Sequence, residues 1–221
     1  SGEVFVAGAD PDCENQACHP GSTLIATADG RHGGIGSSVR IDALSVGTLV
    51  WTEAGPEPVT ALMHAEPHTI SPYLRIHTAD TSMAISRGHW LIVNGTAYPP
   101  EKVRIGDVLT TFCCGEQTVT RIAPTVERGK FHLTTPSNTY YADGVLTTTY
   151  IAFVPQRVWQ VAGGWYPHLR YRMGLPITPE GEGPFSIFLP FHIYTALRVP
   201  KVIVDAAWPL TMTITLATEL A

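Results

Sequence analysis

The chain has 221 residues, of which 44% are apolar and 15% are charged. This length allows one large or two small domains, and the apolar content excludes an intrinsically disordered chain. The net charge of −5 gives no electrostatic basis for nucleic-acid binding, so we expect no nucleic-acid partner.

The composition favours β-structure over helices. The 18 prolines and 20 glycines accompany frequent Val, Ile, Thr and Tyr residues, a combination typical of short strands joined by tight turns. We therefore expect an all-β fold without long helices before residue 155. The four cysteines, at positions 13, 18, 113 and 114, lack the spacing of a zinc site, and we expect neither a metal nor a cofactor.

Cys18 and His89 are the first candidates for chemistry. Cys18 opens the run C-H-P-G-S (18–22), and His89 closes the run S-R-G-H (86–89). Each residue also has an ordinary explanation, because Cys18 could form a disulfide with Cys13 and His89 could be a packed polar residue in a strand. Cys13 could equally pair with one of the adjacent cysteines at 113 and 114.

A duplicated β framework lies between and beyond these two residues. Residues 41–50 and 100–109 match at one constant spacing, without a gap. The matched pairs are Leu44/Val103, Val46/Ile105, Gly47/Gly106 and Val50/Leu109. Each run continues through a glycine turn into alternating strands, so the sequence predicts two copies of one β unit packed face to face around a central cleft.

Five segments together resemble the Hint fold, the self-processing domain shared by inteins and the C-terminal half of Hedgehog proteins. They are C-H-P-G-S (18–22), A-L-S-V-G-T-L-V (43–50), S-R-G-H (86–89), V-R-I-G-D-V-L (103–109) and G-V-L-T-T-T-Y (144–150). No single motif is specific for this family, but the order of the five segments and the internal duplication together are. The resemblance implies an all-β Hint fold with pseudo-two-fold duplicated units over residues 18–155, an upstream flank at 1–17 and an extension of mixed structure at 156–221.

The sequence looks more similar to Hedgehog than to inteins. Inteins usually end in His-Asn, whose asparagine cyclises to release the C-terminal segment, whereas this chain reads L-T-T-T-Y (146–150) at that place. The last step of splicing is therefore not expected. The chain departs from Hedgehog domains in having His19 where Phe is usual, Ser86 for Thr, and Thr149 for a cysteine. His64 aligns with the aspartate that activates the sterol hydroxyl.

The resemblance implies self-cleavage at the Ala17–Cys18 bond. Cys18 would attack the preceding carbonyl and move the acyl group from nitrogen to sulfur. His89 would protonate the departing nitrogen, and Ser86 would hydrogen-bond the carbonyl or amide of residue 17. His64 would then act as the general base for a second nucleophile, although it could also be a surface histidine in a polar turn.

The tail is rich in aromatic residues and prolines. Its two longest uncharged runs, 185–197 and 206–218, are too short to span a bilayer as helices. They could lie in a membrane interface or pack on the β core. The residues expected to bind lipid are Trp159, Trp165, Phe188, Phe191 and Trp208.

Three functions remain open at this point. The first is a single-turnover, cysteine-dependent autoprotease and sterol transferase that passes the upstream segment to a sterol or other lipid alcohol. The second is an intein-like or bacterial Hint domain that only hydrolyses the thioester, and the third is a non-catalytic lipid- or membrane-binding β module. The first implies a monomer that is secreted or in the endoplasmic reticulum and associated with a membrane surface, although no secretory leader is recognisable.

Overall fold

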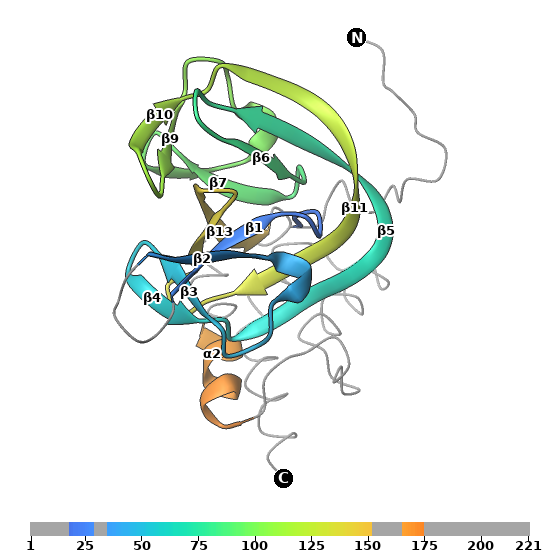
Figure 1. The fold of residues 1–221 in the computed structure, drawn as a ribbon, viewed down its shortest axis with the longest axis vertical. Helices are drawn as coiled ribbons and strands as arrows, with labels where there is room; N and C mark the ends of the chain where they lie inside the picture. The colour runs from blue at the N-terminus through green and yellow to red at the C-terminus, as the bar shows by residue number, and fades with distance from the viewer. Residues whose placement is uncertain (1–17, 29–34, 152–164, 175–221) are drawn as a thin grey trace, which may run out of the picture.

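The computed structural model describes residues 18–28, 35–151 and 165–174, and these ranges confirm the all-β prediction (Figure 1). The strands are β1 (Leu24–Ala28), β2 (Ile35–Arg40), β3 (Leu49–Thr52), β4 (Gly55–Pro58), β5 (Ala61–His77), β6 (Ser82–Ile85), β7 (His89–Val93), β8 (Thr96–Tyr98), β9 (Val108–Thr111), β10 (Gly115–Thr118), β11 (Arg121–Thr134), β12 (Thr139–Ala142) and β13 (Val145–Ile151). Two short 3-10 helices, η2 (Ile41–Ala43) and η3 (Pro100–Lys102), precede β3 and β9.

The duplicated framework is visible in the backbone hydrogen bonds. The run η2–β3–β4–β5 is repeated as η3–β9–β10–β11. In the first copy Gly47 N donates to Val59 O at 2.8 Å, and in the second Gly106 N donates to Val119 O at 2.9 Å. Both glycines have a positive φ, +91° and +98°, which explains why the repeat requires glycine at this turn.

The two units are interlocked by β5 and β11, which form a long curved antiparallel ribbon (Figure 1). Thr60 N, just before β5, donates to Thr134 O at the end of β11 at 2.9 Å. Thr120 N, just before β11, donates to His77 O at the end of β5 at 2.8 Å. Each long strand therefore starts in one unit and ends against the other, so residues distant in the sequence meet at the centre.

Ten of the other strands form one sheet, whose main order is β10-β9-β7-β13-β12-β1-β3-β4. In the same sheet β2 pairs with β1, and β8 pairs with β7. The remaining strand, β6, pairs with β5 and so extends the ribbon. The sheet and the ribbon enclose an apolar core whose largest fully buried side chains include Ile25, Ile76, Leu91, Leu109 and Tyr140. Each aliphatic side chain buried in this way contributes about 2 kcal/mol of transfer free energy. Along β7 the burial alternates, so His89 faces inward with Leu91 and Val93.

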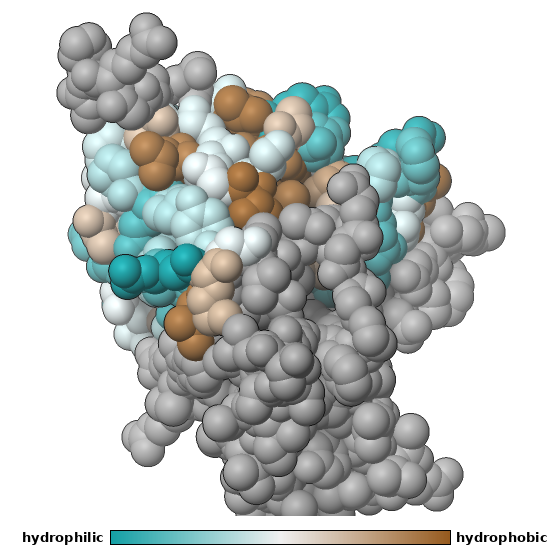
Figure 2. Space-filling view, turned by 90° about the horizontal axis from the view of Figure 1, so that it is seen from below, coloured by the Kyte–Doolittle hydropathy of each residue, from teal (hydrophilic) through white to brown (hydrophobic). Residues whose placement is uncertain are grey.

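One α-helix, α2 (Trp165–Arg172), follows the β core within the described ranges. Tyr171 of this helix lies beside Gly47 at the turn of the first unit. The remainder of the predicted extension, and the predicted boundary at residue 155, lie outside the described residues. No helix in the described part of the chain has the length and apolarity needed to cross a bilayer. On the face seen in Figure 2, apolar side chains occur in separate groups among polar ones.

Candidate active site

The C-H-P-G-S run lies against the inner side of β11. His19 and Phe131 form a β-bridge, in which His19 N donates to Phe131 O at 2.8 Å and Phe131 N donates to His19 O at 2.9 Å. Two residues on, Gly21 N donates to Arg128 O at 3.0 Å. These bonds fix the position of Cys18, whose side chain is completely buried.

A close backbone approach at Gly129 makes this docking possible. Gly129 lies at a bulge in β11 with φ +94°, and a Cβ there would lie only 2.6 Å from Gly21 N. Any side chain at position 129 would push the run that follows Cys18 away from the ribbon. The local sequence R-G-K (128–130) is therefore part of what places the nucleophile.

Ser86 is hydrogen-bonded to both the backbone nitrogen and the backbone carbonyl of Cys18. The amide nitrogen of Cys18 donates to Ser86 Oγ at 2.8 Å, and Ser86 N donates to Cys18 O at 3.0 Å. The first of these bonds involves the nitrogen of the bond predicted to be cut. The sequence-based expectation was a contact with the carbonyl or amide of residue 17, but Ala17 lies outside the described residues.

His89 follows Ser86 across a tight turn and is completely buried. Its Nε2 lies 2.5 Å from the Thr148 carbonyl oxygen, which can only accept, so we assign the proton to Nε2 and the lone pair to Nδ1. This Nδ1 is buried and has no hydrogen-bond partner among the described residues. Burial holds the pKa of His89 well below 6.5, and the neighbouring His19 and His132 lower it further.

Two more histidines, His19 and His132, belong to the cluster, and no role was predicted for either from the sequence. The ring centroids of His19 and His89 are 4.5 Å apart, and those of His89 and His132 are 5.3 Å apart. Desolvation by burial lowers the pKa of His19 to about 4 and that of His132 to about 3. All three imidazoles are therefore neutral at physiological pH. No group of three or more His, Cys, Asp or Glu side chains in the described ranges is arranged to hold a metal ion.

Each of these two histidines is oriented by a backbone carbonyl. His19 Nδ1 donates to Ala84 O at 3.1 Å, which leaves the buried His19 Nε2 with a lone pair and no partner among the described residues. His132 Nε2 donates to Thr149 O at 3.2 Å. The C-terminal strand β13 thus supplies carbonyls to both His89 and His132.

Tyr140 was also missed, although it completes the pocket. Its hydroxyl lies 3.3 Å from His89 Nε2, and its ring centroid is 5.8 Å from that of His19. Burial raises the pKa of Tyr140 well above 10, and the nearby Cys18 raises it further. Cys18, His89 and Tyr140 therefore share one buried environment.

His64 is near the cluster but does not contact His89 directly. It lies opposite His132 in the β5–β11 register, with the ring centroids 6.4 Å apart. Its Nδ1 is 3.8 Å from Glu66 Oε1, and its side chain is 23% exposed. The bond to His64 is the main cause that lowers the pKa of Glu66 to about 2. The structure therefore places His64 on the solvent side of His132.

The remaining predicted residues are mostly outside the described ranges. Trp159, Phe188, Phe191 and Trp208 all lie there, and Trp165 is the first residue of α2. Cys113 and Cys114 form a disulfide with each other at the β9–β10 turn. This disulfide excludes the predicted pairing of one of them with Cys13, because neither sulfur can form a second disulfide.

Comparison with known proteins gives a fold likeness only. No protein-family model matches the chain, and no curated protein matches it. Among solved structures, the gp41-1 intein matches with a TM-score of 0.51 and 17% identity, over 60% of this chain and 98% of that one.

Two further inteins match to the same degree. A variant of the Ssp DnaB mini-intein matches with a TM-score of 0.51 and 14% identity, over 62% of this chain and 96% of that one. A DnaB intein from Synechocystis matches with a TM-score of 0.51 and 14% identity, over 60% and 98%. The β core of this chain therefore has the Hint fold of the inteins, as its motifs and duplication predicted.

Proposed function

We propose that the chain is an intein-like autoprocessing domain, which cleaves the Ala17–Cys18 bond through a thioester that water then hydrolyses. The observation that carries this proposal is the bond from the Cys18 amide nitrogen to Ser86 Oγ, in the same buried environment that holds the lone pair on His89 Nδ1. Hydrolysis is preferred to lipid transfer because the structural likeness is to inteins.

The first step exchanges a C–N bond for a C–S bond. Cys18 Sγ attacks the Ala17 carbonyl carbon, and the thiol proton passes to a nearby base, for which His89 Nδ1 is our candidate. That proton is then delivered to the amide nitrogen as the C–N bond breaks, which leaves a thioester and the free amine of Cys18. No proton is gained or lost in this step.

The environment of His89 suits proton delivery. A histidine whose pKa is well below 6.5 is a strong acid once it is protonated, so it transfers its proton readily to a poorly basic nitrogen. Ser86 Oγ already accepts the N–H of that amide and so holds it in place. In the proposal Ser86 holds the amide, and His89 protonates it.

The second step returns Cys18 to a thiol. Water adds to the thioester carbonyl, the C–S bond breaks, and Ala17 leaves as a carboxylic acid. His132 and the more exposed His64 form a row from His89 towards solvent, which provides acceptors for the proton that the water loses. Because L-T-T-T-Y (146–150) contains no asparagine, release of the C-terminal segment by cyclisation is not part of the proposal.

The test is to incubate the purified chain and to follow its intact mass. Dithiothreitol is expected to release residues 1–17 as a thioester adduct, and buffer alone is expected to release them more slowly as the free acid. Tris(2-carboxyethyl)phosphine controls for reduction of the Cys113–Cys114 disulfide, because it reduces disulfides without attacking a thioester. A Cys18→Ala variant that cleaves equally would contradict the proposal.

Added sterol distinguishes the lipid-transfer alternative in the same experiment. Hydrolysis predicts that residues 1–17 carry no lipid mass when sterol is present. A sterol adduct that depends on Cys18 would instead support the transferase. Unchanged mass under all conditions would leave the non-catalytic β module as the better description.

A further inference from the structure

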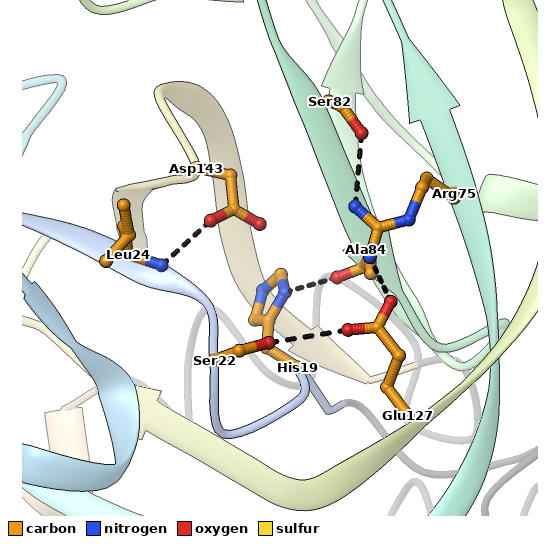
Figure 3. Close-up of polar contacts among 8 residues, drawn as sticks. All are labelled: His19, Ser22, Leu24, Arg75, Ser82, Ala84, Glu127 and Asp143. Carbon is orange, nitrogen blue, oxygen red and sulfur yellow. Dashed lines mark hydrogen bonds and ion pairs between the residues drawn. The ribbon is translucent and has the colours of Figure 1, made fainter.

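Asp143 lies in the turn between β12 and β13 and is bonded to Leu24 of β1 through both its backbone and its carboxylate, and Figure 3 shows the carboxylate bond. Its backbone nitrogen donates to Leu24 O at 2.7 Å, and Leu24 N donates to its Oδ1 at 2.8 Å. The residue has a φ of +48°, a conformation that aspartate and asparagine tolerate better than most side chains. Neither bond is needed to close the turn itself.

The same residue is also joined to β6. Its carbonyl accepts a hydrogen bond from Thr81 Oγ1 at 2.5 Å, and Thr81 is the residue just before β6. Within β6, Ala84 O accepts the His19 Nδ1 proton at 3.1 Å, as Figure 3 shows. Asp143 and the imidazole next to Cys18 are therefore both bonded to the same segment, residues 81–84.

The three segments that meet at Asp143 each carry part of the candidate site. The run before β1 carries Cys18, the segment after β6 carries Ser86, and the hairpin β12–β13 carries Tyr140. Loss of the contacts at Asp143 would therefore loosen the relative position of all three. We propose that Asp143 is a positioning residue for cleavage, which holds β1 against β6 so that the Cys18 amide meets Ser86 Oγ. This inference rests on the function proposed above.

Ionisation of the Asp143 carboxyl group does not stabilise the fold. Burial raises its pKa to about 6, and Glu127 on β11 acts in the same direction. The bond from Leu24 N and the charge of Arg75 on β5 act in the opposite direction, but Arg75 is itself paired with Glu127 and bonded to Ser82 (Figure 3). Because the folded pKa lies above the ordinary 3.8, this group makes folding less favourable as pH rises from about 4 to 6. A carboxylate that opposes folding when charged points to a role in the site.

The test compares Asp143→Asn with Asp107→Asn. Asp107 likewise accepts a backbone N–H, from Arg104 at 2.7 Å, but it lies in the turn of the second unit. For Asp143→Asn we expect thiol-induced cleavage at least tenfold slower at pH 7.5, and loss of the inflection near pH 6 in the rate profile. We expect Asp107→Asn to cleave like the wild type. Equal rates and equal pH profiles in all three proteins would overturn the inference.

Thr81→Val is an independent test that leaves the Asp143 carboxylate in place. It removes the bond to the Asp143 carbonyl, so cleavage should slow while the inflection near pH 6 remains. An unchanged rate in Thr81→Val overturns the inference even if Asp143→Asn does not fold. Absence of cleavage in the wild type would instead refute the proposed function, so the two failures are distinguishable.

Discussion

Ser86 is the residue that most directly connects the fold to the proposed chemistry. Its hydroxyl accepts the Cys18 N–H and its backbone N–H donates to the Cys18 carbonyl, and Ser86 is buried. A hydroxyl is the smallest group that can accept the Cys18 N–H here. The sequence identified Ser86 through its place in S-R-G-H, where the family usually has threonine, another hydroxyl residue.

Replacing Ser86 by alanine should therefore affect both folding and cleavage. The Cys18 N–H would lose its acceptor, which lowers the free energy of unfolding by about 1–3 kcal/mol. Cleavage should slow by about tenfold or more, because the scissile nitrogen is no longer held. Ser86→Thr is the matched control and should cleave at close to the wild-type rate. The measurements are urea unfolding and the rate of release of residues 1–17.

His19 gives a second prediction at the scale of the residue. Its pKa is about 4 in the folded chain and near 6.5 when unfolded, so the unfolded state binds the extra proton between these values. The contribution of His19 to the free energy of unfolding is therefore complete above pH 6.5 and is lost as pH falls towards 4. At pH 5 the loss from this group is about 2 kcal/mol.

His19→Phe removes this titration. The variant should lose less stability than the wild type between pH 7.5 and pH 5, by about 2 kcal/mol in urea unfolding. His132, whose pKa is about 3, contributes in the same direction in both proteins. A wild-type pH dependence in His19→Phe would show that this imidazole is not the buried neutral group described above.

At the scale of the element, the ribbon of β5 and β11 brings the catalytic candidates together. The end of β11 is buried on both faces, from Phe131 to Thr134. Side chains that point either way from this segment are therefore interior. His132, on this segment, therefore lies inside the protein beside His89, and His64 lies on the far side of His132.

Gly129→Ala tests the contact between the ribbon and the C-H-P-G-S run. The added Cβ would approach Gly21 N to 2.6 Å, so we expect a loss of about 1–3 kcal/mol from overpacking as well as slower cleavage. Gly115→Ala is the control, because Gly115 also has a positive φ, +69°, but a Cβ added there would have no atom within 4 Å among the described residues. That variant should lose only about 1 kcal/mol and keep its cleavage rate. Equal effects of the two substitutions on cleavage would argue against the close contact at Gly21.

At the scale of the whole molecule, the internal duplication was the feature that the sequence predicted best. The gap-free pairing of Leu44 with Val103 and of Gly47 with Gly106 corresponds to two equivalent turns with equivalent hydrogen bonds. A repeat of this kind can be recognised in the sequence because both copies form the same turn and strands and need similar residues at the same positions. The placement of Cys18 beside Ser86 followed from the order of the motifs.

The other members of the site depend on contacts that no local pattern encodes. His132 lies in F-H-L-T-T (131–135), which reads as an ordinary strand, and it approaches His89 only because β11 crosses into the other unit. Tyr140 and Asp143 similarly read as a strand and a turn residue. His64, which the resemblance aligns with a catalytic aspartate, is separated from His89 by the ring of His132.

The central claim is that the sulfur of Cys18 carries the acyl group of Ala17, and hydroxylamine trapping tests it most directly. The account predicts that mass spectrometry finds residues 1–17 ending in a hydroxamate at Ala17, together with a fragment that begins at Cys18. Both products should be absent from Cys18→Ala treated in parallel. Recovery of the intact chain from the wild type, or of the same fragments from Cys18→Ala, would contradict the account.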